Sequence, residues 1–144
     1  MRVAANQSVR VRAQLLDRLV NQAGEVSITR ARLESDMGQI KGSLRDLTDN
    51  LDRLRGQLRD IELQAETQIT ARMERAKAEG ESFDPLEMDR FTRFQELTRM
   101  MAESVNDVGT VQRTLQRTLE TAEDELAMQA RLTRNLQDDL LRTR

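Results

Sequence analysis

A heptad repeat of apolar residues runs through the first half of the chain. From Leu19 onward, apolar residues recur at alternating intervals of four and three, with mostly polar residues between them. This spacing is typical of a helix that keeps one face against a partner helix. The seam consists of Leu19, Ala23, Val26, Arg30, Leu33, Met37, Ile40, Leu44, Leu47, Leu51, Leu54, Leu58, Ile61, Ala65 and Gln68. The pattern therefore predicts one long helix that needs a partner.

The first helix is predicted to run from about residue 13 to about residue 79, because no proline interrupts it and its glycines are isolated. Residues 1–10 are predicted to be a flexible or extended lead-in. The short stretch at residues 9–12 alternates Val and Arg with a period of two, which favours an extended segment. The helical domain is thus predicted to span residues 11–144.

Helix-stop and helix-start signals lie together after residue 79. A turn over about residues 80–84 is predicted to join the first helix to a second helix over about residues 85–143. The turn and cap residues are Gly80, Phe83, Asp84, Pro85, Glu87 and Met88. Asp84 is the expected N-cap, and Pro85 is the expected first residue of the helix. Glu87 is expected to complete a capping box, and Phe83 is expected to pair with Met88 as a hydrophobic staple.

Two long helices joined by a short turn pack as antiparallel neighbours. If the turn is centred near Ser82 and Phe83, residues whose numbers add up to about 165 lie at one level, which places Gly56 beside Gly109. The predicted core consists of Leu16, Leu19, Val26, Leu33, Met37, Ile40, Leu44, Leu47, Leu51, Leu54, Leu58, Ile61, Phe91, Phe94, Met101, Val105, Val108, Leu115, Leu119, Leu126, Leu136 and Leu140.

A single hairpin leaves much of this apolar surface in water, and the second helix carries apolar residues on more than one stripe. The wider face consists of Leu97, Met100, Met101, Val108, Val111 and Leu115. Burial of apolar area stabilises by about 25 cal/mol per Å². We therefore predict an all-α fold in which two antiparallel coiled-coil hairpins form a homodimeric four-helix bundle, with both turns at the same end.

The composition offers little chemistry. The chain of 144 residues has no His and no Cys, and its net charge is −2. The usual general base and metal ligand are therefore missing, and no basic field attracts nucleic acid. No apolar run is long enough to span a membrane. We predict a cytoplasmic protein that is not an enzyme, with no cofactor, no metal site, no nucleic acid partner and no membrane insertion.

Two seam features have alternative interpretations. Arg30 occupies a core position, and two interpretations are open. Its stem extends out to water, or its guanidinium forms a polar layer that fixes the register, with Gln129, Thr133 or Asn135 across the hairpin and with the symmetry-related Arg of the dimer. The matched glycines, Gly56 and Gly109, either mark a bend of the bundle or coincide by chance.

The first helix also carries a specific family motif. Residues 9–33 read VRVRAQLLDRLVNQAGEVSITRARL, and residues 136–144 read LQDDLLRTR. Both segments resemble the dimerisation domain of CheA-type chemotaxis histidine kinases, the first its opening and the second its end. The residues around Phe83–Phe91 and Ala102–Asp107 are similar to the long-hairpin branch of type IV pilus (twitching) systems, the ChpA/PilL-like hybrid kinases. Gly24 and Glu25 match the family pattern without an evident physical role.

This resemblance implies a non-catalytic domain of a two-component signal transduction protein. The hairpin dimer would hold two kinase subunits together for phosphoryl transfer between them and would relay a signal. Chemoreceptors and a CheW-like coupling protein are the implied partners, in an array beneath the inner membrane.

Two alternatives stay open: a structural coiled-coil scaffold and a chemoreceptor-like signalling hairpin. An ATP-binding domain following Arg144 would favour the kinase.

Overall fold

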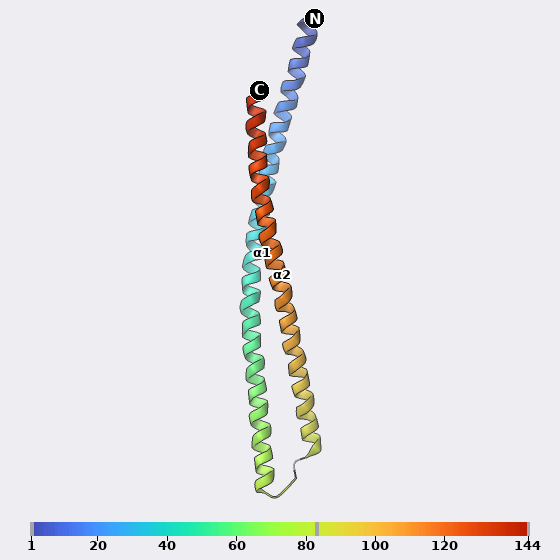
Figure 1. Ribbon diagram of the computed structural model, residues 1–144, viewed down its shortest axis with the longest axis vertical. Coiled ribbons are helices and arrows are strands. Elements are labelled where there is room, and N and C mark those ends of the chain that lie inside the picture. Colours follow the sequence, from blue (N-terminus) through green and yellow to red (C-terminus); the bar gives the residue numbers. More distant parts are fainter. Residues whose placement is uncertain (1, 83, 144) are drawn as a thin grey trace. The chain divides into compact units, whose positions relative to one another are not determined.

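The computed structural model describes residues 2–82 and 84–143, and for Arg2 it describes only the backbone. It contains two helices, α1 over Arg2–Ala78 with 77 residues and α2 over Pro85–Thr143 with 59 residues. The helices pack as a hairpin (Figure 1), and no strand occurs within the described residues. The predicted all-α helical hairpin is confirmed.

The N-terminal segment differs from the prediction. The lead-in predicted over residues 1–10 is helical wherever the structure describes it, because α1 already begins at Arg2. Period-two alternation over only four residues is a weak signal, whereas Arg, Ala and Gln are good helix formers and no Gly or Pro precedes Gly24. Intrinsic helix propensity therefore outweighs the short alternation.

The end of α1 is closed by backbone hydrogen bonds around Gly80. The N–H of Glu81 donates to the carbonyl of Ala76 (2.9 Å), and the N–H of Gly80 donates to the carbonyl of Lys77 (3.2 Å). These two bonds form a Schellman motif. Gly80 has a φ of 71°, a left-handed conformation that glycine adopts without steric cost. The chain therefore leaves the helix at this residue.

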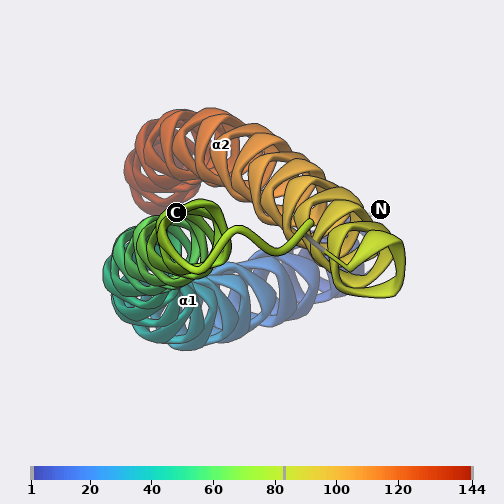
Figure 2. The ribbon, with the colours of Figure 1, turned by 90° about the horizontal axis from the view of Figure 1, so that it is seen from below.

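The start of α2 is capped by Asp84. The N–H of Leu86 donates to Asp84 Oδ1 (3.0 Å), which satisfies one of the free donors of the first turn. Glu87 is directed to α1, where its Oε1 lies 3.0 Å from Arg72 Nη1. The predicted staple involves Phe83, which lies outside the described residues. Seen from the turn end, the connection runs from the end of α1 to the start of α2 (Figure 2).

The hairpin divides into two compact units. The terminal unit contains the residues up to Gly42 and those from Gln116 onward, and the turn unit contains Ser43–Leu115. In the terminal unit, the beginning of α1 and the end of α2 lie at the same end (Figure 1). Each unit is a pair of antiparallel helix segments.

The register of the pairing can be followed from the buried residues. In the turn unit, Leu58 and Val105 are buried partners in one apolar cluster, and their numbers add up to 163. In the terminal unit, Lys41 forms an ion pair with Glu123, and these numbers add up to 164. The register lies one or two residues below the predicted 165, because the turn is centred midway between Ala78 and Pro85.

The core of the turn unit is small. Leu51, Leu58 and Val105 form its buried cluster, and Leu47 and Ala102 pack against it. In the described part of the chain, no side chain is enclosed to below 2 % exposure. A single chain therefore buries a narrow line of residues and leaves the rest of its apolar surface accessible.

Candidate interaction surface

The burial pattern divides the predicted seam into two stripes. One stripe, which we call the paired stripe, is buried or half-buried between the helices and repeats every seven residues. Its members are Leu16, Ala23, Arg30, Met37, Leu44, Leu51, Leu58 and Ala65 in α1, and Phe91, Thr98, Val105, Gln112, Leu119, Leu126, Thr133 and Leu140 in α2. The paired stripe is therefore the contact within one hairpin.

The second stripe, which we call the open stripe, lies three residues further along each helix. Its members are Leu19, Val26, Leu33, Ile40, Leu47, Leu54, Ile61 and Gln68 in α1, and Phe94, Met101, Val108, Leu115, Ala122, Gln129 and Leu136 in α2. All are exposed except the half-buried Leu47 and Ala122. Leu54 is 37 % exposed and Met101 is 51 % exposed, so large apolar side chains face solvent in the single chain.

The open stripe contains twelve of the 22 predicted core residues. Seven predicted residues are buried: Met37, Leu44, Leu51, Leu58, Val105, Leu119 and Leu140. Four are half-buried: Leu16, Leu47, Phe91 and Leu126. The other eleven are exposed: Leu19, Val26, Leu33, Ile40, Leu54, Ile61, Phe94, Met101, Val108, Leu115 and Leu136. Their burial by a partner stays a prediction.

The apolar surface of α2 is wider than that of α1. Leu97, Val111 and Leu132 each lie one residue before a paired position and are 58–63 % exposed. On a helix these residues are adjacent to the open stripe. The corresponding residues of α1 are polar except Leu15, for example Asp36 and Asn50. Exposed apolar side chains that lie side by side often mark an interaction site, whereas single scattered ones do not.

The open stripe of the terminal unit includes a groove of about 490 Å³. It is lined by Leu33, Met37, Ala122, Glu125, Leu126, Met128, Gln129 and Leu132. Most of this lining is apolar, and both helices contribute to it. Gln129 is a polar member of the open stripe in this unit.

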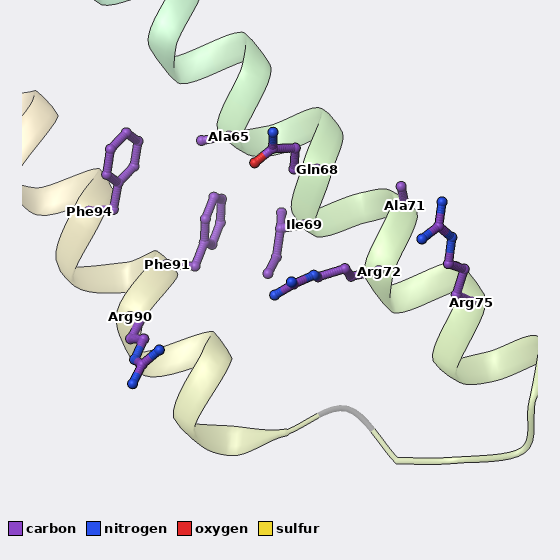
Figure 3. Close-up of a pocket in the computed structure, with 9 residues that line it drawn as sticks. All are labelled: Ala65, Gln68, Ile69, Ala71, Arg72, Arg75, Arg90, Phe91 and Phe94. Carbon is purple, nitrogen blue, oxygen red and sulfur yellow. The ribbon is translucent and has the colours of Figure 1, made fainter.

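The turn unit has a larger cavity, of about 610 Å³, where the helices approach the turn. Figure 3 shows Ile69, Arg72 and Phe91 directed into the space between the helices, whereas Arg90 is directed away. In α1 the half-buried positions after Ala65 are Ile69 and Ala76, instead of the heptad position Arg72. An inserted interval of four rotates the apolar stripe and locally unwinds a coiled coil. The sequence-based reading of the seam missed this change of phase.

Arg30 is the only charged residue in the paired stripe. Its side chain is 19 % exposed, and its Nε lies 3.7 Å from Glu34 Oε1, one turn further along the same helix. Its Nη1 is buried and has no hydrogen-bond partner among the described residues. At the same level of α2 lies Thr133, which is 8 % exposed. The guanidinium is therefore incompletely satisfied in a single chain.

Thr98 in the paired stripe is satisfied within its own helix, and an ion pair joins the two helices beside the stripe. The hydroxyl of Thr98 donates to the carbonyl of Phe94 (2.6 Å), four residues earlier in α2. Lys41 Nζ lies 3.2 Å from Glu123 Oε1, with both side chains about two-fifths exposed. Exposed ion pairs of this kind contribute about 0–1 kcal/mol. They orient the helices only weakly.

Gly109 and Gly56 do not face each other, so this prediction is wrong. A Cβ added to Gly109 would lie 2.9 Å from Arg55 Nη2, whereas a Cβ added to Gly56 would meet nothing within 4 Å. Gly109 comes four residues after Val105 and faces α1, whereas Gly56 comes five residues after Leu51 and lies on the outer side. Gly109 therefore makes room for the Arg55 side chain.

Acidic side chains of the described residues form ion pairs on the surface. Within residues 2–82 and 84–143, no three acidic side chains gather as a metal site would require. The carboxylates of Glu96 and Glu103 flank Arg99 at 3.0 and 2.8 Å. A hydrogen bond to Glu96 and the charge of Glu103 raise the pKa of Arg99, which is an ordinary exposed ion network. In the same described residues, neither helix has the length of apolar sequence needed to cross a membrane.

Comparison with known proteins finds a family model that matches part of the chain. Residues 6–69 match the family model of the signal transducing histidine kinase, homodimeric domain. The matched segment lies within α1 and covers less than half of the chain. No curated protein and no solved structure matches the chain. The match supports a histidine kinase homodimerisation domain, and such a domain is not itself catalytic.

Proposed function

We propose that this chain is the non-catalytic homodimerisation domain of a CheA-like chemosensory histidine kinase. Two hairpins pair their open stripes and form a four-helix bundle, with both turns at the same end. The bundle holds two kinase subunits together, so that phosphoryl transfer occurs between subunits.

The open stripe is the observation that carries this proposal. It repeats through α1 and α2 at heptad spacing, yet its large apolar side chains are exposed in the single chain. Burial of apolar area is worth about 25 cal/mol per Å², and a stripe of this length offers many such side chains. A partner that continues the heptad packing buries the open stripes of both helices at once.

A second copy of the chain is the partner that fits best. Both helices of one hairpin carry an open stripe, so two identical hairpins related by a twofold axis place α1 of one copy beside α2 of the other. The family model that matches residues 6–69 describes a homodimeric domain. The motif in residues 9–33 agrees with this family.

The finer assignment follows the sequence resemblance. We place the domain in a type IV pilus (twitching) or chemotaxis pathway, in a cytoplasmic array that includes chemoreceptors and a CheW-like coupling protein. The domain relays a signal if the bundle has two packings of similar energy and receptor contacts favour one of them. In a full-length kinase that carries this segment, the variant Leu54→Glu should abolish phosphoryl transfer between two differently inactivated subunits.

A structural coiled-coil scaffold and a chemoreceptor-like signalling hairpin are the alternatives. Either one would use the same two stripes. Neither accounts for the match of residues 6–69 to a histidine kinase family. Phosphoryl transfer that is unchanged in the Leu54→Glu kinase would favour a scaffold over the proposed role.

A matched pair of variants tests the dimer. Leu54 lies on the open stripe and is 37 % exposed, whereas Leu63 lies on the outer side of the same helix and is 55 % exposed. Leu54→Glu places a charge at the proposed interface, where an unpaired buried charge costs several kcal/mol. Leu63→Glu makes the same chemical change on the outer surface, where water solvates the charge. Light scattering after size-exclusion chromatography gives the mass of each variant.

We expect wild type and Leu63→Glu to have twice the chain mass of 16.6 kDa. Leu54→Glu should have the mass of one chain and keep its helical circular dichroism. Equal masses for Leu54→Glu and Leu63→Glu would show that the open stripe is not the interface.

A further inference from the structure

Arg30 and Gln129 are polar residues in stripes that are mostly apolar. Arg30 is the only residue that is not apolar in the paired stripe of α1, and Gln129 is a polar residue of the open stripe in α2. Both lie in the terminal unit. Gln129 lines the apolar groove together with Leu33, which is one helical turn from Arg30, about 5 Å along the axis. The two polar residues therefore lie in neighbouring layers.

The guanidinium of Arg30 requires an acceptor that a single chain does not provide. Its Nε faces Glu34, but its Nη1 is buried and has no hydrogen-bond partner among the described residues. A buried donor without a partner costs about 1–3 kcal/mol, and more if the group is charged. The unpaired guanidinium of Arg30 therefore destabilises the chain unless another group accepts its hydrogen bond.

Gln129 has the complementary requirement once a dimer forms. It is exposed in the single chain, so water satisfies its carboxamide. Pairing of the open stripes removes that water, and the amide then needs partners inside the bundle. In a twofold bundle, α2 of the second copy lies beside α1 of the first, which brings the second Gln129 to the layer next to Arg30. The carboxamide oxygen is an acceptor, and the buried Nη1 is a donor.

We propose that the Arg30 side chain turns toward the open stripe when the dimer forms and donates a hydrogen bond from its guanidinium to Gln129 of a second copy, and that this polar layer fixes the register of the dimer. This inference rests on the proposed homodimer. Thr133 shares the layer with Arg30, and Glu34 balances the charge of each guanidinium at the edge of the bundle. A shift by one heptad would place Arg30 against Ala122 or Leu136, and Gln129 against Ala23 or Met37. A single polar layer of this kind selects one register at a cost in stability.

Replacement of Arg30 by leucine tests the layer. The variant Arg30→Leu removes the buried charge, so we expect a dissociation constant lower by on the order of tenfold or more. It should also allow more than one register. The control is Arg32→Leu, which removes the same charge two residues away on the exposed face. Because the chain has no Cys, a spin label at Gln39→Cys is unique in each copy.

Distances between the two labels, measured by pulsed electron spin resonance, report the register. Wild type and Arg32→Leu should give one narrow distance distribution, whereas Arg30→Leu should give a broad or multiple distribution. A slip by one heptad moves the helices by about 10 Å along the axis. Sedimentation of the same samples gives their mass and dissociation constants.

Gln129 has its own test. Gln129→Glu gives the guanidinium a charged acceptor and should strengthen the wild-type dimer, but it should weaken the dimer that carries Arg30→Leu. Equal effects of Gln129→Glu in both backgrounds would show that the two residues do not interact.

The possible results separate the two proposals. A dimeric wild type with a single distance in Arg30→Leu overturns the polar layer and leaves the dimerisation domain standing. A wild type that is monomeric at all concentrations overturns both. If all three proteins are dimers and only Arg30→Leu has a broad distribution of label distances, the polar layer is supported.

Discussion

The paired and open stripes follow the same heptad repeat but have very different surroundings. Leu58 in the paired stripe is 4 % exposed, whereas Leu54, one turn earlier in the open stripe, is 37 % exposed. Both belong to the same heptad repeat of α1. The comparison teaches that a heptad seam predicts which side chains need burial, but not which helix buries them. In this hairpin, the second helix of the same chain covers one stripe only.

The largest expected effect comes from the paired stripe. Leu58→Ala removes a buried side chain from the cluster with Leu51 and Val105. Such truncations cost about 2–5 kcal/mol of unfolding free energy. We expect this loss at every protein concentration, measured by thermal or urea unfolding. Leu63→Ala, on the outer side, should change the free energy by less than about 0.5 kcal/mol. A similar loss of unfolding free energy in both variants would contradict the assignment of Leu58 as buried and Leu63 as exposed.

The open stripe should respond only when a dimer is present. Ile40 is 50 % exposed in the single chain, so Ile40→Ala should leave the unfolding of a monomer almost unchanged. At concentrations that favour the dimer, we expect a loss of about 1–3 kcal/mol per copy. Because dimerisation makes the melting temperature depend on protein concentration, a dilution series separates the two cases. A loss that does not change with dilution would mean that Ile40 packs within its own chain.

Two glycines test which face of each helix lies against the other helix. Gly56 lies on the outer side with open space around it, so Gly56→Ala should stabilise the protein by up to about 1 kcal/mol through helix propensity. Gly109 faces α1, where a new Cβ would lie 2.9 Å from Arg55 Nη2. The Arg55 side chain then has to move, so Gly109→Ala should stabilise less. Melting temperatures of the two variants provide the test, and a larger gain at Gly109 would contradict the assigned faces.

The smallest expected effect concerns the rim of the paired stripe. The ion pair of Lys41 and Glu123 joins the helices of the terminal unit, but both side chains are substantially exposed. Lys41→Met should therefore cost less than about 1 kcal/mol, and the loss should shrink at high salt. Glu123→Gln serves as the reciprocal control. A cost of several kcal/mol would show that charge, and not the apolar stripe, holds this unit together.

Much of the fold could be predicted from the sequence. The heptad period predicts two long helices, and Gly80, Asp84 and Pro85 predict where the chain turns, because each of these residues acts locally. The lead-in prediction over residues 1–10 failed because a four-residue alternation competed with the helix propensity of its neighbours. The change of phase after Ala65 was missed because Gln68 and Arg72 continue the heptad count while Ile69 takes over the contact.

The candidate interface was predicted less completely. The sequence contains the apolar seam as one set of residues, and its division into two stripes depends on how α2 rotates against α1. That rotation is set by packing along both helices, which no local signal encodes. Arg30 was identified as a buried charge from its heptad position, but its unsatisfied Nη1 depends on the positions of its neighbours.

Methionine oxidation provides the most direct test of the open stripe as a dimer interface. Met100 and Met101 are adjacent in α2 and are both 51 % exposed in the single chain. Met101 lies on the open stripe, whereas Met100 lies two residues after Thr98, toward the outer side. Peroxide oxidation of the wild-type chain, followed by mass spectrometry of each residue, compares them under identical conditions. We predict rapid oxidation of Met100 and strong protection of Met101, with protection lost in Leu54→Glu. Equal rates for the two methionines in the wild-type chain would contradict the proposed dimer.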